Sequence, residues 1–388
     1  MTSADLAATL MRTYDTFRSA NVSPVTCKHA TVHRVIDEYL ARDGTSLSAE
    51  VLGASIEGRT IRMITCGTGP VHVLLWSQMH GDETTATLAL LDMFNLLSGP
   101  SASEGWMREM LTGVTLHVIP MLNPDGAERV QRLTAVGIDI NRDALKLLTP
   151  EARILREAQK RLSPAFGFNL HDQDPNSVGQ STNVTTIALL APAADPERTA
   201  TPGRQRAMKV AALIVTTLKP YIAGHCATYS DTFEPRAFGD NIQRWGTSTV
   251  LIESGQWPDD PDKTYVRKLN VVALFVSLHA IAAGSYESAD LSAYNELEEN
   301  RDRMLDIIVR GATVTHASGW TGVADIGFTK TTLPAHENAR YAVKSIGDLS
   351  TFGALKTIDG LPKPIDVSAI GVDKSFSEEQ VRDLLGSL

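Results

Sequence analysis

Cysteine is scarce in this chain of 388 residues, and Cys27, Cys66 and Cys226 stand far apart. Their spacing predicts neither a disulfide framework nor a zinc site built from thiolates. An excess of basic residues is missing as well, because the formal net charge is -9, so binding to a nucleic-acid backbone is not expected. The few cysteines favour a reducing compartment, and the charge favours partners other than nucleic acids.

Long apolar runs are also absent. The longest one, Val271 to Gly284, contains His279 and is too short to span a bilayer. Charged residues such as Asp5 and Arg12 interrupt the N-terminal stretch, which therefore lacks the apolar centre of a secretory signal. From these absences we expect a cytoplasmic protein without a membrane segment. No pattern in the sequence indicates an oligomeric state.

The chain divides into three regions by pattern. Residues 1–48 predict a helical N-terminal extension. Residues 49–285 alternate apolar strands with helical stretches, which predicts an α/β domain with a sheet between layers of helices. Residues 286–388 differ, and we expect a small α+β appendage there. It would contain a charged helix over Leu291–Ile308, short β-like segments, and a final helix that starts at the capping box Ser377–Gln380.

Polar signatures follow four apolar runs that predict strands. The runs are Val71–Gln78, Val114–Met121, Ala165–Leu170 and Thr247–Ile252. The signatures are His80-Gly81-Asp82-Glu83, Asn123-Pro124-Asp125-Gly126 with a downstream Asp139-Ile140-Asn141-Arg142, Asn169-Leu170-His171, and Ile252-Glu253-Ser254-Gly255. In open α/β sheets the carboxyl ends of the strands form the ligand-binding edge. We therefore expect these distant signatures to share one pocket.

The first and third signatures suggest a metal site. His80 and Glu83 are three residues apart, which puts both side chains on one face of the first turn after a strand. A catalytic zinc commonly takes two histidines and one carboxylate and leaves one position open, so His171 is the natural third ligand. An isolated His-x-x-Glu pair would more simply be a coincidence.

Glu253 is a candidate general base. It ends the apolar run Val250–Ile252, where an unpaired carboxylate is costly unless it faces a polar cavity. Such a carboxylate can take a proton from water that a metal has acidified. The alternative is a carboxylate at a strand end that caps the next helix or pairs with an arginine.

The middle signature suggests substrate recognition. Asn141 and Arg142 can grip a free carboxylate, the guanidinium through two parallel hydrogen bonds. Arg132 can polarise a scissile carbonyl and stabilise the oxyanion that develops. Asp139 is a candidate partner for a metal-ligating histidine, whose tautomer it would fix. The simpler interpretation of each arginine, taken alone, is an exposed salt bridge.

Taken in order, these signatures resemble the zinc carboxypeptidase family, the funnelin-type metallocarboxypeptidases, over about residues 50–285. The family pattern is His-x-x-Glu, then Asn-Pro-Asp-Gly with a downstream Asp-x-Asn-Arg, a later histidine and a late glutamate. The resemblance implies an α/β/α sandwich around a mixed, mostly parallel eight-stranded sheet. It also implies one zinc ion per chain, held by His80, Glu83 and His171.

The resemblance implies roles for further residues. Glu253 would be the general base, Arg132 would stabilise the oxyanion, and Asn141 with Arg142 would hold the terminal carboxylate of the substrate. Asp139 would stand behind the first histidine. Digestive members of the family also carry a tyrosine on a mobile loop before the catalytic glutamate, and Tyr229 lies in the corresponding region.

The chain departs from the family pattern at two positions. Asp143 follows Arg142 where the family usually has asparagine, which would place a negative charge close to the carboxylate pocket. Asp172 follows His171 where the family often has serine, which affects the expected contacts to the upstream peptide. Specificity in the family is set near the positions of Phe238, Gly239 and Asp240, and these residues indicate no clear preference for a basic or an acidic side chain.

The sequence therefore favours a zinc-dependent hydrolase that removes C-terminal residues from peptides. One alternative is an N-acyl amino acid amidohydrolase of the aspartoacylase or succinylglutamate desuccinylase kind, which shares much of the pattern and carries a β-rich C-terminal segment. Others are a hydrolase of cell-wall or other non-protein peptides, and a non-catalytic binding protein on the same scaffold. The substrate of the carboxypeptidase would be a peptide and that of the amidohydrolase an acyl amino acid, and both would carry a free carboxylate.

Overall fold

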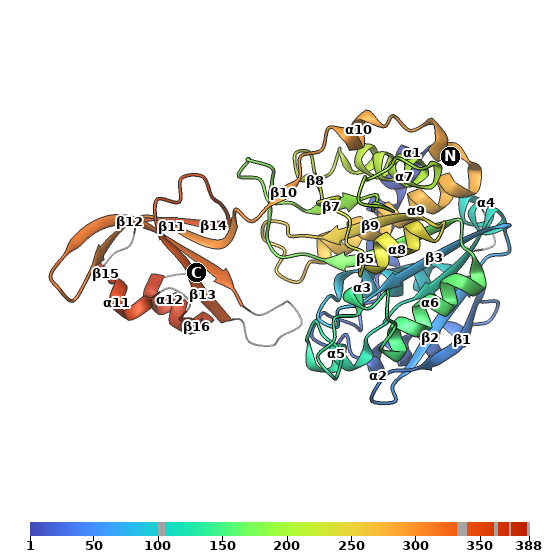
Figure 1. Cartoon of the computed structure of the whole chain (residues 1–388), viewed down its shortest axis with the longest axis horizontal. Helices are drawn as coiled ribbons and strands as arrows, with labels where there is room; N and C mark the ends of the chain where they lie inside the picture. Colours follow the sequence, from blue (N-terminus) through green and yellow to red (C-terminus); the bar gives the residue numbers. More distant parts are fainter. Residues whose placement is uncertain (100–101, 103–104, 332–339, 361–363, 372–373, 386–388) are drawn as a thin grey trace.

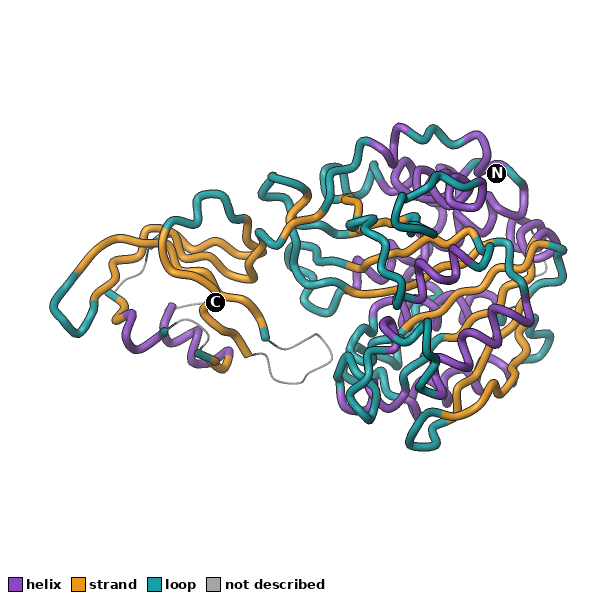
Figure 2. Tube along the Cα trace, in the orientation of Figure 1, coloured by secondary structure: helices purple, strands orange, loops and turns teal. Residues whose placement is uncertain are grey.

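The structure is a computed structural model that describes residues 1–99, 102, 105–331, 340–360, 364–371 and 374–385 (Figure 1). A large α/β unit contains the N-terminus, and a smaller β-rich unit follows it along the chain. The two units lie side by side and are joined through β10 (Asn300–Arg301) (Figures 1 and 2).

An eight-stranded mixed sheet forms the centre of the large unit. Its strands lie in the order β1 (Leu47–Ala54), β2 (Thr60–Cys66), β4 (Val114–Ile119), β3 (Val71–Ser77), β5 (Phe166–Asp172), β9 (Ser248–Ser254), β7 (Ile187–Leu190) and β8 (Cys226–Thr228). The central strands β4, β3, β5 and β9 run parallel to one another. The expected mixed, mostly parallel eight-stranded sheet is confirmed, as are its four predicted strands within one or two residues at each end.

Helices cover both faces of this sheet, and the strand sequences explain why. In β3, Val73 and Leu75 enter one apolar cluster, whereas Leu74 and Trp76 enter another on the opposite face. The first cluster is covered by α1 (Ser3–Thr13), α2 (His29–Leu40), α3 (Thr85–Leu97), α4 (Gly105–Gly113), α7 (Pro202–Leu218) and α9 (Thr264–Ala283). The second is covered by α6 (Pro150–Leu162) and α8 (Phe238–Arg244). The expected α/β/α sandwich is therefore present.

A buried polar network ties the N-terminal helices to this core. The Asp92 carboxylate accepts hydrogen bonds from Tyr14 Oη at 2.7 Å, from the Ser19 backbone N–H at 2.7 Å and from Arg267 Nε at 2.7 Å. These groups come from the N-terminal segment, α3 and α9. Because an unpaired charge would be costly inside the protein, the network fixes how the first helices pack.

Among the residues that the structure describes, one helix, α9, is long and apolar enough to cross a membrane, but 83% of its most apolar window is buried inside the protein. Leu269, Val272 and Phe275 belong to the main apolar cluster. A helix that is apolar all round is expected in the centre of a large domain, and α9 occupies that position here.

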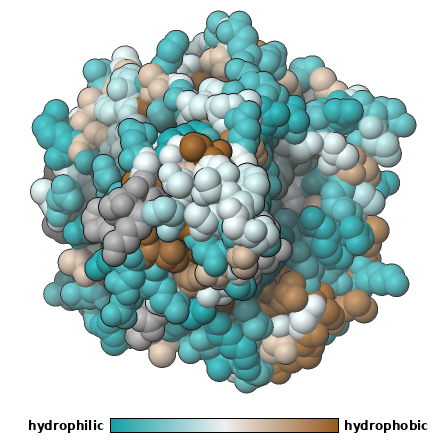
Figure 3. All heavy atoms as spheres, turned by 90° about the vertical axis from the view of Figure 1, so that its left-hand side faces the viewer, coloured by the Kyte–Doolittle hydropathy of each residue, from teal (hydrophilic) through white to brown (hydrophobic). Residues whose placement is uncertain are grey.

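The smaller unit is a second sheet. Its strands lie in the order β14 (Gly353–Asp359), β11 (Met304–Thr315), β12 (Thr321–Lys330), β13 (Arg340–Gly347) and β16 (Ser375–Ser377), and β15 (Ile365–Asp366) pairs with β11. The short α11 (Val367–Ile370) and α12 (Glu378–Leu385) accompany it. Seen from the end of the molecule that the smaller unit occupies, the surface is pale at its centre and mostly hydrophilic around it, with apolar side chains in patches (Figure 3).

The helix expected over Leu291–Ile308 is wrong. Only α10 (Ser292–Asn295) is helical there, and β10 and the start of β11 follow. The β-branched Ile307, Ile308 and Val309 favour a strand, and they are buried between β12 and β14. The predicted capping box is confirmed: the Gln380 N–H donates to Ser377 Oγ at 3.2 Å, and the Ser377 N–H donates to Gln380 Oε1 at 2.8 Å.

Candidate metal centre

The loop after β3 brings the first signature to the edge of the sheet. A close contact between two glycines fixes this loop: an added Cβ at Gly81 would lie 2.0 Å from the carbonyl carbon of Gly126. Gly126 belongs to α5 (Pro124–Arg129), whose first turn is capped by Asn123 through a 2.9 Å hydrogen bond to the Gly126 N–H. The first two signatures therefore pack directly on each other, and their backbones set the position of His80.

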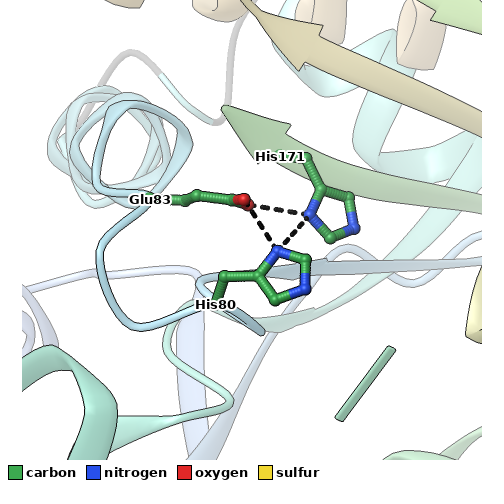
Figure 4. A group of neighbouring side chains, drawn as sticks. All are labelled: His80, Glu83 and His171. Atoms are coloured by element: carbon green, nitrogen blue, oxygen red, sulfur yellow. Dashed lines mark hydrogen bonds and ion pairs between the residues drawn. The ribbon is translucent and has the colours of Figure 1, made fainter. Parts of the chain in front are cut away.

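His80, Glu83 and His171 converge on one point (Figure 4). His80 Nδ1 lies 2.7 Å from Glu83 Oε1, His171 Nδ1 lies 2.8 Å from Glu83 Oε2, and the two Nδ1 atoms are 3.1 Å apart. All three side chains are buried. The predicted set of three residues is thus brought together, with the same ring nitrogen of each histidine facing the carboxylate.

This donor set fits a zinc ion. Two imidazoles and one carboxylate are a common ligand set of catalytic zinc, and neighbouring ligand atoms of a tetrahedral zinc are about 3.3 Å apart. The 3.1 Å between the two Nδ1 atoms is close to that separation. Without a cation, two nitrogen lone pairs would face each other beside a buried carboxylate, which only a proton could relieve.

The pKa values of these three side chains are shifted by burial and by the charges of their neighbours. Burial disfavours the charged form of His80, but Glu83 and Asp139 outweigh it and raise the pKa of His80 to about 9. Burial lowers the pKa of His171. Burial would raise the pKa of Glu83, yet the two histidines overcome it and hold that pKa below its ordinary value. Glu83 is therefore an ionised, buried carboxylate, the form that a cation binds.

Asp139 and Arg132 lie next to these residues. Asp139 Oδ1 is 3.2 Å from His80 Nε2 and accepts the Asn141 N–H at 2.8 Å, while Asp139 Oδ2 accepts from Arg132 Nε at 3.1 Å. Arg132 Nη1 is 3.6 Å from Glu83 Oε1, and the arginine side chain is 44% exposed. The structure therefore places Asp139 behind His80, and Arg132 at the rim with its guanidinium toward the centre.

Glu253 stands beside His171 on the neighbouring strand, because these two residues are register partners in the parallel pair β5–β9. Among the residues that the structure describes, none donates a hydrogen bond to its carboxylate, which lines a cleft of about 640 Å³. Burial, and then the negative charge of Glu83, raise the pKa of Glu253 well above its ordinary value. A buried carboxyl group with a raised pKa in a cleft is typical of a group that exchanges protons.

Asn141 and Arg142 line the same cleft. The Phe238 N–H donates to Asn141 Oδ1 at 2.9 Å, which leaves the NH₂ group of Asn141 available as a donor. Arg142 Nε lies 3.6 Å from Glu234 Oε2, and Glu234 also accepts from Arg236 Nη2 at 2.8 Å. The two predicted donors for a carboxylate are therefore adjacent, and Glu234 already lies beside one of them.

Two further residues complete this side of the cleft. Tyr229, which the resemblance indicated, lies in its wall and is 39% exposed. Asp240 lines it too, and burial raises the pKa of the Asp240 carboxyl to about 6. The candidate metal ligands, the candidate base and the candidate substrate-binding residues therefore line one cavity, with Asp139 behind His80. Phe238 and Gly239 are not part of its lining.

The two departures from the family pattern have different outcomes. Asp143 is buried and accepts from the Leu148 N–H at 2.9 Å, the Thr149 N–H at 2.8 Å and Thr149 Oγ1 at 3.0 Å. Its charge is thus turned toward the loop before α6 and is absent from the lining of the cleft. Asp172 does line the cleft, where it accepts from Thr85 Oγ1 at 2.6 Å and lies 3.5 Å from Lys263 Nζ.

Several residues of the site were not found from the sequence. Glu234 and Lys263 are near no predicted strand end, and a lysine that is 2% exposed carries no local signal of its burial. Met304, Thr329, Lys330 and Lys344 of the smaller unit also line the cleft. Their part in the site depends on how two units pack together, which no local pattern encodes.

Residues 32–197 match the family model described as zinc carboxypeptidase. Carboxypeptidase 2 of Trichophyton tonsurans is 31% identical over 102 residues, which is 26% of this chain and 18% of that protein. Carboxypeptidase M of Mus musculus is 27% identical over 88 residues, covering 21% of this chain and 20% of that protein. The chain therefore spans about a fifth of the length of these curated relatives.

Solved structures show the same fold. A metallo-carboxypeptidase from Burkholderia cenocepacia superposes with a TM-score of 0.52 at 18% identity, covering 65% of this chain and 68% of that one. Bovine thrombin-activatable fibrinolysis inhibitor superposes with a TM-score of 0.54 at 13% identity, covering 67% of this chain and 97% of that one. The resemblance seen in the sequence is thereby confirmed in both the family match and the fold.

Proposed function

We propose that this chain, with its match to the zinc carboxypeptidases, is a zinc-dependent hydrolase that removes the C-terminal residue of a peptide. The observation that carries the proposal is the meeting of His80, Glu83 and His171 beside Glu253 in a cleft that also holds Arg142. The first three residues would hold the ion, one per chain. When bound, the zinc ion would acidify water and polarise a carbonyl group.

The residues around the ion have distinct tasks in this proposal. Glu253 takes a proton from the attacking water and later gives it to the leaving amine, as a general base and then a general acid. A divalent cation nearby would counter the raised pKa of Glu253 and favour its ionised form. Arg132 donates hydrogen bonds to the oxyanion from the rim of the cleft.

The other end of the substrate is held by Asn141 and Arg142. The terminal carboxylate would accept hydrogen bonds from the Asn141 NH₂ group and from the Arg142 guanidinium, displacing Glu234 from its position beside Arg142. Tyr229 in the wall of the cleft would cover the bound terminal residue. Holding both ends of the scissile bond in place supplies much of the rate enhancement expected of such a site.

Metal analysis and hydrolysis together test this function. Purified protein should contain about one zinc per chain, release C-terminal amino acids from hippuryl-type peptides, and lose this activity when a chelator removes the metal. The variant Glu253→Gln should keep its zinc and lose activity by about 10²–10⁴-fold, because only proton transfer is removed. Near wild-type hydrolysis by this variant would exclude Glu253 as the base, and protein that binds no zinc would favour a binding role on this scaffold.

A second candidate is an N-acyl amino acid amidohydrolase. The β-rich unit after β10 favours it, because relatives with that activity carry a β-rich C-terminal segment. The same metal, base and carboxylate-binding residues would serve, and only the acyl side of the scissile amide would differ. Comparing N-acyl amino acids with peptides of the same C-terminal residue separates the two, since each enzyme should cleave its own class much faster.

A further inference from the structure

The smaller unit is held against the large one by backbone pairing. β10 forms an antiparallel pair with β6 (Ser177–Val178), in which Asn300 faces Val178 and Arg301 faces Ser177. The Asn300 side chain donates to Gln173 Oε1 at 2.6 Å. Gln173 lies two residues after His171, so this contact anchors the smaller unit close to the candidate metal centre.

A close approach at Gly353 brings the two units together at a second point. A Cβ added at Gly353, the first residue of β14, would lie 2.5 Å from the carbonyl oxygen of Thr182 in the large unit. It would also lie 2.5 Å from Sδ of Met304. The second sheet therefore packs directly on the large unit.

The smaller unit forms one wall of the cleft above the metal ligands. Met304 of β11, Thr329 and Lys330 of β12, and Lys344 of β13 line this cleft together with Glu253. A substrate bound at the metal ligands therefore has the second sheet beside it. This wall lies outside residues 32–197, which match the family model.

A second cavity of about 380 Å³ continues from the first one between the two units. The linings of the two cavities share Asp174, Pro175 and Lys330, so the cavities adjoin at these residues, and we call the pair the groove. Apolar side chains line the far part, and they come from both units: Pro175, Trp257, Pro261, Ile307, Tyr341 and Leu355. Charged side chains of both signs surround them, among them Asp259, Lys356 and Arg382.

We propose that this groove binds the part of a peptide substrate upstream of the scissile bond, in extended form and with an apolar side chain at the far end. The inference rests on the proposed function for the position of the scissile bond. An apolar centre with a charged rim is typical of surfaces that bind polypeptide. Each residue of an extended chain advances by about 3.3–3.6 Å, so each residue added at the upstream end of a peptide reaches farther from the metal ligands.

Continuity with the metal site favours this occupant over a free small molecule. A ligand specific to the far cavity would need no open path to Glu253, whereas a peptide chain held at its C-terminus must leave the cleft in some direction. Lys330 lies where the two cavities meet, and its side chain is part of both linings. The second sheet would thus act as a specificity element that selects longer peptides.

Binding to the full-length zinc-loaded Glu253→Gln variant tests the proposal without turnover. The ligands are N-acetylated peptides of two to seven residues that share one C-terminal dipeptide and carry leucine or serine at the upstream end. We expect affinity to rise about tenfold with length, and to rise more for leucine than for serine, because apolar area is removed from water. Fluorescence anisotropy of labelled peptides gives the dissociation constants.

Substitutions in the far cavity locate the effect. Leu355→Asp, added to this variant, should abolish the gain for the longer peptides and leave dipeptide affinity unchanged. Leu355 belongs to none of the apolar clusters of the smaller unit, so its substitution should leave the fold intact. Leu355→Ala should lower the affinity for the longer peptides by less than Leu355→Asp does. Val323→Asp is the matched control, because Val323 is 75% exposed on β12 and lines neither cavity.

The outcomes separate this inference from the proposed function. The groove would be overturned as a binding site if peptides of all lengths bound with equal affinity. It would also be overturned if Leu355→Asp lowered the affinity for short and long peptides equally. Length-dependent binding that Leu355→Asp abolishes, found together with no hydrolysis of any peptide by the zinc-loaded wild type, would support the groove and overturn the carboxypeptidase. Hydrolysis of peptides by the wild type, together with an affinity that does not depend on peptide length, would support the carboxypeptidase and overturn the groove.

Discussion

Asp139 lies behind His80: its Oδ1 is 3.2 Å from Nε2 of the ring, while Nδ1 of the same ring faces Glu83 at 2.7 Å. The carboxylate also accepts the backbone N–H of Asn141 and the Nε–H of Arg132. One side chain therefore sets the tautomer of a candidate metal ligand, the turn that carries Asn141, and the direction of Arg132. Such partners of ligating histidines are known to tune metal affinity.

Asp139→Ala should accordingly weaken zinc binding by about 10–100-fold, because His80 loses the partner that orients its ring. Asp139→Asn keeps an acceptor oxygen and should show a smaller loss. Competition with a chromogenic chelator measures both. The control is Asp37→Asn, because Asp37 forms an exposed ion pair with Arg62 away from the site. Unchanged zinc affinity in Asp139→Ala would show that the ring is held by other contacts.

Glu234 should compete with the substrate for Arg142. Its Oε2 lies 3.6 Å from Arg142 Nε, and both side chains are partly exposed, so the pair contributes about 0.5–1 kcal/mol at most. Glu234→Gln should therefore lower KM about two- to fivefold and leave kcat unchanged. Steady-state kinetics on one peptide measure this.

Arg142→Met supplies the control for that effect. On its own it should raise KM strongly, because the guanidinium can no longer bind the terminal carboxylate. In the Arg142→Met background, Glu234→Gln should then have no further effect on KM. A similar decrease in both backgrounds would mean that Glu234 acts on the loop and not through Arg142.

Asp143 should matter for stability and not for specificity. Its carboxylate accepts three hydrogen bonds from Leu148 and Thr149, which hold the loop before α6. Asp143→Ala should lower the free energy of unfolding by about 2–4 kcal/mol, since buried donors lose a charged acceptor. Asp143→Asn, which restores the usual family residue, retains one acceptor oxygen and should cost less. Thermal unfolding measures the stabilities, and a changed preference for the terminal residue would contradict this role.

Asp240 should make stability depend on pH. Burial raises its pKa from 3.8 to about 6, so between these values the folded protein keeps a proton that the unfolded chain has released. Stability contributed by this group is therefore complete below about pH 4 and is lost as pH rises through 6. Asp240→Asn should raise the free energy of unfolding by roughly 2–3 kcal/mol at pH 7.5 and by little near pH 4. An equal gain at both pH values would contradict this explanation.

The sequence predicted the centre of the fold well, because its signals there are local. The buried parallel strands β3, β4, β5 and β9 appear as apolar runs in the sequence. The order of the signatures at the ends of these strands also predicted that His80, His171 and Glu253 meet. The carboxyl ends of parallel strands lie at the same edge of a sheet, so residues that follow these strands can be placed together without knowing their long-range contacts.

The rest depends on tertiary structure. The charged residues after Leu291 suit an exposed helix, yet pairing with β12 and β14 makes the following residues a strand, and such pairing overrides local propensity. Asp143 is next to Arg142 in sequence but points to the loop at Thr149, and neighbouring residues of a turn commonly diverge in this way. Lys330 enters the site only through the packing of one unit on the other.

The contact between Gly81 and Gly126 has a consequence for mutational scans. An added Cβ at Gly81 would lie 2.5 Å from the Cα of Gly126, and one at Gly126 would lie 2.8 Å from the backbone carbonyl oxygen of Gln131, so a larger residue at either position would force the backbone to shift. Neither glycine offers a side chain to a metal ion or a substrate. A screen that scores every single substitution by activity should nonetheless rank both with the histidines. Such a screen alone would therefore place two glycines, whose role is to let the backbones approach, among the chemically active residues. Measuring zinc content and folding yield would distinguish the glycine variants from the histidine variants.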